Sequence, residues 1–566
     1  MLMNNHNILY FILFYLIITC SIVGYGNFFQ LIIRQKNYKI NLGYQGIFGL
    51  FFCSIYSYVS SFFFSHSLIH NTFFLVIGLL FFTYNFLKYY KENKRNYLIL
   101  LIIFSILFIS SLLFKNHDDF EYYHFPYTYF LTQFKSVLGI GVFNHGFRTP
   151  SSLFYINSLF YLPLIQFYFF HMSAILIMGF ANFIIFKKIL YSFKINTFNF
   201  ISYLCLFSII FINIFFYRIA EHGTDRSAQI LIFVMIIEML LIFNFKEYAS
   251  KNLQKVTQVL ILIALIISLK AFYILYSIFI IYLSFFLYKK NLLIKFIHNF
   301  LPVILFCFLM LLLVLLINFQ NSGCFLYPVN FTCFNSLWSI NIEEVDLMGR
   351  WYEQWSKGGA APNYRVENPE IYIQDFNWVS NWVKIYFFSK VLDFLLGISF
   401  LVLVLLLFFC SKNSIKDKKN RTYKIILALL LVLFMEWFYN HPALRYGGYC
   451  LVGLLIFIPS SVFLEKHGNS KKIKNKFFIL ILLTILIFIS RNYNRIANEH
   501  KQYSYEPINI TFYNVQKNYF GIHVQIENLI KEYKECKINK SLNVCNEKKD
   551  INTGTFMNKY YFKRSE

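Results

Sequence analysis

The 566-residue sequence has little charge, and its acidic residues are about half as many as its basic ones. Charged residues make up 14% of the chain and hydrophobic residues 58%, with a mean hydropathy of +0.53. A composition this apolar excludes an ordinary soluble domain. Apolar stretches long enough to cross a bilayer recur along most of the chain, which predicts an all-α polytopic membrane protein.

A soluble basic region is also missing. The chain has 52 Lys and Arg against 27 Asp and Glu, a net charge of +25, but no basic domain outside the apolar segments. Most cations lie in short linkers, as is typical of loops held on the cytoplasmic side of a membrane. Membrane lipids are therefore expected partners and nucleic acid is not. The first apolar segment lacks a basic start and a clear cleavage site, so we expect a retained helix there.

Hydropathy predicts about fourteen membrane spans. We place them at 8–32, 44–64, 68–87, 97–114, 169–187, 198–217, 227–245, 255–270, 272–288, 297–318, 384–410, 424–439, 447–465 and 477–490. The basic clusters between these spans all fall on one face if the spans alternate. By the positive-inside rule this face is cytoplasmic, and both termini then lie outside.

The opposite face holds the more polar segments. They are amphipathic stretches near 119–134 and 150–166, a turn at 221–226, a long loop at 319–383, a turn at 440–448 and a tail at 491–566. Four cysteines of the loop and tail form two closely spaced pairs, Cys324 with Cys333 and Cys536 with Cys545. Each pair predicts a disulfide in an oxidising compartment, the alternative being reduced thiols placed by chance.

The densest group of acids follows directly after the apolar run 97–114. Adjacent carboxylates at a water–lipid boundary raise each other's pKa, which suits a general base. We therefore predict Asp118 and Asp119 as catalytic residues that act as a general base, and His124 as a substrate contact. The alternative is that Asp118 caps a helix beginning near Phe120. Carboxylates with imidazole also suit divalent metal ions, but no spacing here is diagnostic of a metal site.

A second charged turn, at residues 218–227, lies on the same face between two spans. It contains Glu221 and Asp225, which we predict as further catalytic acids, and Arg226, which we predict as a substrate contact. The alternative is a solvated hairpin in which Thr224 or Asp225 caps the following helix.

Two cations on this face suit an anionic head group. Arg445 is the only cation of the turn 440–449, and a guanidinium can grip a phosphate with two parallel hydrogen bonds. Lys270 lies where two helices meet in a tight turn, and Tyr446 adds a hydroxyl or a stacking surface. We predict Lys270, Arg445 and Tyr446 as substrate-binding residues. The alternative for the two cations is snorkelling to the membrane interface.

Four further residues stay unassigned. Glu238 and Glu436 fall inside predicted spans, where acids are functional candidates. Trp351 and Trp355 of the long loop can either stack on sugar rings or anchor the chain at a membrane interface.

These features resemble the GT-C superfamily of polytopic glycosyltransferases, which use polyprenyl-phosphate-linked sugars. The similarity lies in paired acids straight after a membrane helix, amphipathic segments behind them, a second acidic turn two spans later and a tight hairpin around Lys270. It covers about residues 97–318. The resemblance implies a catalytic base at Asp118 or Asp119, an acid at Glu221 or Asp225, and a donor-phosphate contact at Arg445.

The resemblance also implies an organisation and an activity. The segments are an N-terminal three-helix membrane segment (1–96), a GT-C-like catalytic module (97–318), an external loop (319–383), C-terminal membrane helices (384–490) and an external polar tail (491–566). The implied enzyme is an inverting glycosyltransferase that moves a sugar from a polyprenyl-phosphate donor to a glycan or lipid acceptor, on the periplasmic face of a bacterial inner membrane. Such a donor needs no nucleotide site, and no Gly-rich phosphate loop lies on the cytoplasmic face. No cofactor is certain, and a divalent metal is compatible with the acids.

Two other functions fit a polytopic chain. In an O-antigen polymerase or ligase the decisive residues would be Arg350 and Arg365 of the long loop. A lipid-linked glycan flippase or transporter would show paired halves and charges near mid-bilayer. The chain has no clear internal duplication and its charges crowd one face, which disfavours transport.

Overall fold

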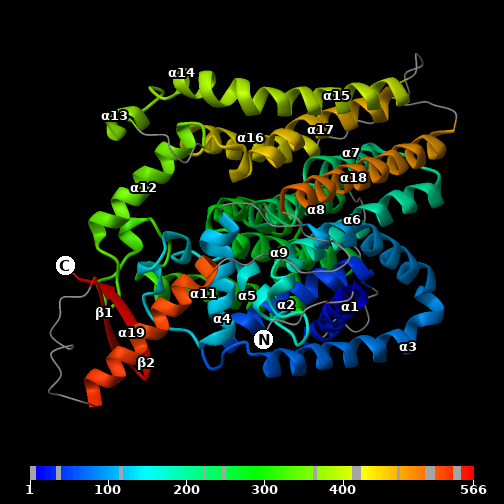
Figure 1. The fold of residues 1–566 in the computed structure, drawn as a ribbon. Helices are drawn as coiled ribbons and strands as arrows, with labels where there is room; N and C mark the ends of the chain where they lie inside the picture. The colour runs from blue at the N-terminus through cyan, green and yellow to red at the C-terminus, as the bar shows by residue number, and fades with distance from the viewer. Residues whose placement is uncertain are drawn as a thin grey trace.

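The protein is almost entirely helical, as expected from its composition (Figure 1). A computed structural model describes residues 8–33, 40–113, 119–221, 223–244, 250–360, 366–410, 422–467, 472–503, 517–538 and 550–565. Within these ranges, ten helices are long and apolar enough to cross a membrane. The chain is therefore a multi-pass integral membrane protein.

The first half of the chain forms most of the tightly packed core. Its helices are α1 (Ile8–Ile32), α2 (Leu42–Ser61), α3 (Leu68–Leu107), α4 (Phe125–Gln133), α5 (Ser152–Ser158), α6 (Met172–Ile195), α7 (Phe200–Phe215), α8 (Gly223–Asn244), α9 (Ser250–Leu269), α10 (Ile278–Lys289) and α11 (Leu293–Ser322). Glycines let α1 and α2 approach closely, because a Cβ on Gly26 would lie 1.7 Å from the Gln45 carbonyl oxygen.

The second half adds membrane-spanning helices that flank this core, together with the polar elements at one end of the bundle. Its elements are α12 (Ile342–Lys357), α13 (Pro369–Ile373), α14 (Val379–Trp382), α15 (Leu392–Phe409), α16 (Thr422–Asn440), α17 (Gly448–His467), α18 (Ile473–Tyr503), α19 (Gly521–Ile538) and the hairpin β1 (Ile551–Phe556) with β2 (Lys559–Arg564). The predicted boundary at residue 490 falls inside α18, which continues into the predicted tail.

The expected spans 68–87 and 97–114 are not separated by a loop, because helix α3 runs from the first into the second. The rings of Phe82 and Tyr97 nevertheless lie 6.2 Å apart, whereas a straight helix would hold them ~22 Å apart. The helix therefore folds back around the basic residues 88–95. Tyr15 and Tyr25 of α1 donate hydrogen bonds to both arms, to the carbonyl oxygens of Phe104 (2.8 Å) and Phe74 (2.6 Å). The expected spans at 44–64, 198–217 and 255–270 are helices α2, α7 and α9, but they are not among the ten candidate spans, so the number fourteen stays a prediction.

The two segments predicted to be amphipathic are mostly buried. Residues 119–134 contain α4 and residues 150–166 contain the short α5, all of whose residues are buried. The Tyr127 and Tyr155 hydroxyls lie 2.7 Å apart and join the two helices. These segments therefore pack largely into the bundle, where their buried polar groups find partners, although Tyr122 stays 51% exposed.

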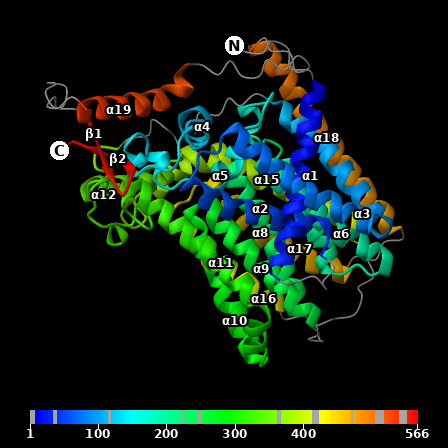
Figure 2. The same ribbon diagram turned by 90° about the horizontal axis from the view of Figure 1, so that it is seen from below.

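The first acidic loop, the long loop and the turn at 441–447 meet at one end of the bundle, because Arg445 of the turn contacts Asp119 of the first and Trp355 of the second; we call this the acidic end. In Figure 1, α12, α13, α19 and the β-hairpin lie together at this end. The hairpin joins the first loop through two backbone hydrogen bonds, from Leu138 to the Tyr560 carbonyl (2.9 Å) and from Phe562 to the Leu138 carbonyl (3.0 Å). Figure 2 shows α19 running beside the hairpin and toward α4.

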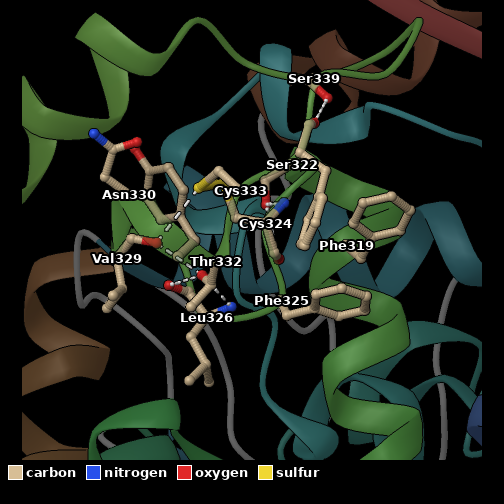
Figure 3. Close-up of a disulfide and its surroundings, with 12 residues drawn as sticks. Phe319, Ser322, Cys324, Phe325, Leu326, Val329, Asn330, Thr332, Cys333 and Ser339 are labelled. Atoms are coloured by element: carbon tan, nitrogen blue, oxygen red, sulfur yellow. Dashed lines mark hydrogen bonds between the residues drawn. A yellow bond between two sulfur atoms is a disulfide. The ribbon is translucent and has the colours of Figure 1, made fainter.

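Cys324 and Cys333 form a disulfide that closes a short loop after α11 (Figure 3). Backbone hydrogen bonds flank the bridge, from Phe325 to Thr332 (3.1 Å) and from Phe334 to Gly323 (2.9 Å). Cys536 is also disulfide-bonded, and its predicted partner Cys545 lies outside the described residues.

Candidate functional site

The first acidic loop enters the bundle through a π-helical turn, η2 (Phe120–His124). The Phe125 amide donates to the Phe120 carbonyl, one residue further than in an α-helix, and both rings are buried. Such turns recur at functional sites. Asp119 precedes this turn, and Asp118 lies outside the described residues.

Arg445 connects the two acidic segments. It lies in the short 3-10 turn Leu444–Tyr446 between α16 and α17. Its Nη2 donates to Asp119 Oδ2 at 2.9 Å and its Nε to Asp225 Oδ2 at 3.1 Å. Its backbone carbonyl accepts from Gln229 Nε2 at 3.1 Å. Gln229 and Asp225 both lie on α8, so this helix holds the turn through Gln229 and the guanidinium through Asp225.

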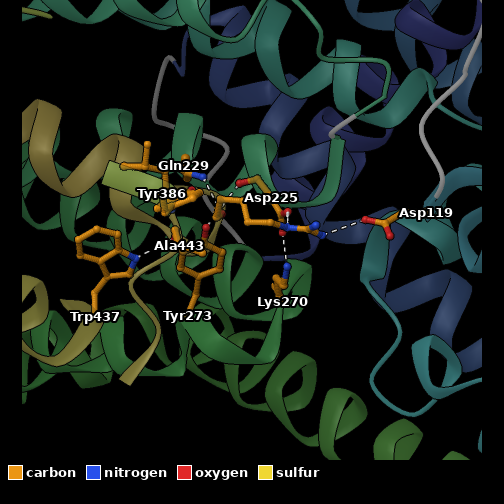
Figure 4. Close-up of polar contacts among 10 residues, drawn as sticks. Asp119, Asp225, Gln229, Lys270, Tyr273, Tyr386, Trp437 and Ala443 are labelled. Atoms are coloured by element: carbon orange, nitrogen blue, oxygen red, sulfur yellow. Dashed lines mark hydrogen bonds and ion pairs between the residues drawn. The ribbon is translucent and has the colours of Figure 1, made fainter. Parts of the chain in front are cut away.

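Lys270 completes the cluster from the turn between α9 and the 3-10 helix Ala271–Ser277. Its ammonium pairs with Oδ1 of Asp225, whereas Arg445 donates to Oδ2 of the same carboxylate. Figure 4 shows Asp225 beside Lys270, with Asp119 across from them. We call Asp119, Asp225, Lys270 and Arg445 the ion-paired cluster.

The cluster is balanced in charge and open to solvent at one side. The Asp225 side chain is 8% exposed, whereas those of Asp119, Lys270 and Arg445 are 24%, 27% and 31% exposed. Asp225 is therefore the inner anchor, and the other three can meet a substrate. Burial disfavours the charged guanidinium of Arg445, but Asp225, Tyr446 and Asp119 outweigh burial and raise its pKa. Burial lowers the pKa of Lys270, although Asp225 partly restores it.

Aromatic rings enclose the two cations. The Trp355 ring centroid lies 5.4 Å from Arg445 Cζ and the Tyr446 centroid 5.6 Å from it, within cation–π range. Lys270 Nζ lies 4.6 Å from the Tyr446 centroid. Burial raises the pKa of Tyr446 to about 12, so its hydroxyl stays neutral and can donate. Trp355 comes from α12, so the long loop contributes to the site.

Residues 8–452 match a family described as a domain of unknown function, DUF8201. The chain belongs to this family. No curated protein and no solved structure matches the chain. The DUF8201 region contains the whole ion-paired cluster and Trp355, whereas α18, α19 and the hairpin lie beyond it.

Glu221 of the DUF8201 region is not part of the ion-paired cluster. Its buried carboxylate pairs with Arg218, whose Nε lies 2.8 Å from Oε2, and with Arg495 of α18. Glu221 therefore ties the turn before α8 to a helix beyond the family region. The sequence contained no signal for this partner, because Arg495 is distant in the chain.

The other predicted contacts divide between the cluster and its surroundings. Arg226 points toward Phe216, with Cζ 5.7 Å from the ring centroid, and is not among the residues that pair with Asp225. His124 interacts electrostatically with Asp225, and its ring packs 4.9 Å from that of Phe154. His124 therefore lies beside the cluster.

Neither intramembrane acid lies in the cluster. Glu238 pairs with Lys188 and accepts from the Tyr44 hydroxyl, which joins α8, α6 and α2. Glu436 accepts from Asn440 at 3.1 Å. No three His, Cys, Asp or Glu side chains among the described residues are placed to hold a metal ion, and Asp118 lies outside that set.

Proposed function

We propose that the protein is a membrane glycosyltransferase that transfers a sugar from a polyprenyl-phosphate donor to an acceptor at the acidic end of the bundle. The observation that carries the proposal is the ion-paired cluster, in which Arg445 bridges Asp119 and Asp225 beside Lys270. A carboxylate and two cations in one solvent-accessible site supply both a base and a binding site for a phosphate. The GT-C resemblance and the positive-inside rule support the same side of a bacterial inner membrane, the periplasmic side.

Donor binding would change the partners of Arg445. A lipid phosphate has oxygens that suit the guanidinium and the ammonium of Lys270, so it competes with Asp119 for Arg445. Asp225 is the more buried acid and keeps both cations in place. Once released from Arg445, the Asp119 carboxylate becomes a stronger base, because it has lost a stabilising positive charge.

The reaction then needs one displacement. Asp119 takes the proton of an acceptor hydroxyl, and the acceptor oxygen forms a bond to the anomeric carbon of the donor. The bond from that carbon to the phosphate oxygen breaks, and its electron pair stays on the lipid phosphate. Arg445 and Lys270 stabilise this leaving charge, as positioned cations do in other group transfers. Attack from the opposite side inverts the anomeric configuration.

Product analysis in cells tests the proposal. Cells lacking the chain are complemented with wild-type or variant genes, and their surface glycans and glycolipids are profiled by mass spectrometry. The product is the glycan or glycolipid that cells lacking the chain do not make. We expect Asp119→Asn to restore at least about a hundredfold less of it than the wild-type gene. Asp346→Asn is the matched control, because Asp346 lies on the long loop and contacts Asn330.

The same experiment separates the alternatives. Full product from Asp119→Asn would overturn Asp119 as the base, and loss of product only from Asp118→Asn would give that role to Asp118. Loss only on substitution of Arg350 or Arg365 would favour a polymerase or ligase. Arg350 pairs with Glu370, whose side chain is 69% exposed, and Arg365 lies outside the described residues.

A further inference from the structure

Helix α12 carries one acidic and two aromatic side chains on one face. Glu344, Trp351 and Trp355 are spaced by seven and four residues, so they line one side of the helix. The rise of an α-helix separates the first from the last by ~16 Å. This face leads from a cavity at the start of the helix to Arg445 near its end.

The cavity at the start of α12 has a volume of about 570 Å³. Polar and charged side chains line part of it, including those of Asn335, Ser339, Asn341 and Arg564, and apolar side chains such as Phe334, Ile340 and Leu347 line the rest. Arg148, which is 4% exposed, pairs there with Glu344 and donates to the Tyr327 hydroxyl at 2.5 Å. Such a mixed wall offers hydrogen-bonding groups beside apolar faces, which suits a sugar ring with its hydroxyls.

An aromatic patch lies midway along α12. The Trp351 ring packs 6.0 Å from His145, and His145 Nδ1 lies 3.3 Å from the Tyr122 hydroxyl. Trp351 and Tyr122 are 37% and 51% exposed. Asn144 Nδ2 donates to the Tyr122 carbonyl at 3.0 Å and holds this loop against η2. Exposed rings beside polar groups offer flat apolar faces together with hydrogen-bonding edges.

The patch is next to the ion-paired cluster. Asp119 interacts electrostatically with His145, and Trp355, one turn after Trp351, lies against Arg445. Burial and the nearby Arg148 lower the pKa of His145, so its imidazole is neutral at pH 7 and can both donate and accept. Cavity, patch and cluster therefore lie one after another along one face of α12, and we call this row the path.

We propose that this path binds an extended oligosaccharide acceptor along α12. Inner sugars occupy the cavity, one ring stacks on Trp351 and Tyr122, and the terminal hydroxyl reaches Asp119. The inference rests on the proposed glycosyl transfer and selects a saccharide over a lipid as the acceptor. A sugar chain alternates apolar ring faces with hydroxyls, which matches the alternation of rings and polar groups along the path.

Native mass spectrometry of the full chain in detergent micelles tests the binding. The probes are oligosaccharides released by mild acid from the envelope polysaccharides of the source cells and fractionated by length. We expect oligosaccharides to bind and single sugars to bind at least about tenfold more weakly. Trp351→Ala should weaken oligosaccharide binding about tenfold, and Trp351→Phe should restore most of it, because stacking survives.

Phe331→Ala is the matched control, because Phe331 is an 87% exposed aromatic on the same long loop and lines neither cavity nor patch. Absence of binding in every length fraction would overturn the inference. So would equal weakening by Trp351→Ala and Phe331→Ala.

The inference and the proposed function fail separately. If oligosaccharides bind through Trp351 but Asp119→Asn forms product normally, the binding path stands and the proposed base falls. If Asp119→Asn abolishes product but no oligosaccharide binds, the proposed function stands and the saccharide acceptor falls.

Discussion

Arg445 donates a hydrogen bond to Asp119 at 2.9 Å, although 326 positions separate the two residues in the chain. The same guanidinium holds Asp225 at 3.1 Å. One side chain from a late turn therefore joins acids from two earlier segments, each of which enters the bundle on its own helix. This bridge is the basis of the proposed site.

Arg445→Lys tests whether the bridge itself matters. A lysine ammonium keeps the charge but lacks the fork that reaches both carboxylates. We expect product formation to fall at least about a hundredfold while the protein still folds. The measurement is the initial rate of product accumulation, together with the melting temperature in detergent. Arg350→Lys, at an exposed ion pair, is the control, and near-normal product from Arg445→Lys would contradict the role assigned to the fork.

Glu221→Gln distinguishes a stabilising role from a catalytic one. The change leaves Arg218 and Arg495 without their shared buried carboxylate, and breaking a buried pair costs about 3 kcal/mol or more. We expect a clearly lower melting temperature by intrinsic fluorescence, with product still formed at low temperature. An unchanged melting temperature with lost product would instead make Glu221 the second catalytic acid that the GT-C resemblance implies.

The buried imidazole of His66 should make the protein less stable in acid. Burial, and secondarily His70, lower its pKa from 6.5 to about 3, and its two ring nitrogens lie 2.8 Å from Ser60 Oγ and 2.6 Å from Ser158 Oγ. Between these pH values the unfolded chain binds the proton that the folded chain excludes, so stability falls as pH falls below about 6.5. We expect the melting temperature to drop between pH 7 and pH 4. His66→Gln, which cannot titrate, should flatten that dependence; an unchanged slope would assign it to other groups.

Phe520 joins the C-terminal segment to the first acidic loop, and we expect this contact to stabilise the loop. Its ring packs 5.5 Å from Phe125 and 4.9 Å from Tyr129. Phe520→Ala removes these contacts, so we expect amide hydrogen exchange in residues 119–134 to become roughly tenfold faster. Val524→Ala is the control, because Val524 is 49% exposed on the same segment. Equal exchange in both variants would show that the tail does not support the loop.

The sequence was sufficient for the features that depend on local pattern and composition. Apolar runs predicted the membrane helices because each run must bury its own backbone hydrogen bonds. The scarcity of acids singled out Asp119 and Asp225, and turn position singled out Lys270 and Arg445. The short spacing of Cys324 and Cys333 was enough to suggest the disulfide that the structure contains.

Only the tertiary structure decided which of these residues meet. Hydropathy shows that a helix lies in a membrane but not which neighbour it packs against, so Glu221 and Asp225 looked equivalent in sequence. In the packed bundle Glu221 pairs with Arg495, whereas Asp225 pairs with Arg445 and Lys270. Trp355 became part of the site for the same reason, because helix α12 brings it onto Arg445 from a loop with no local sign of that contact. Long-range pairs depend on how whole helices pack together, and that information is not contained in any single segment.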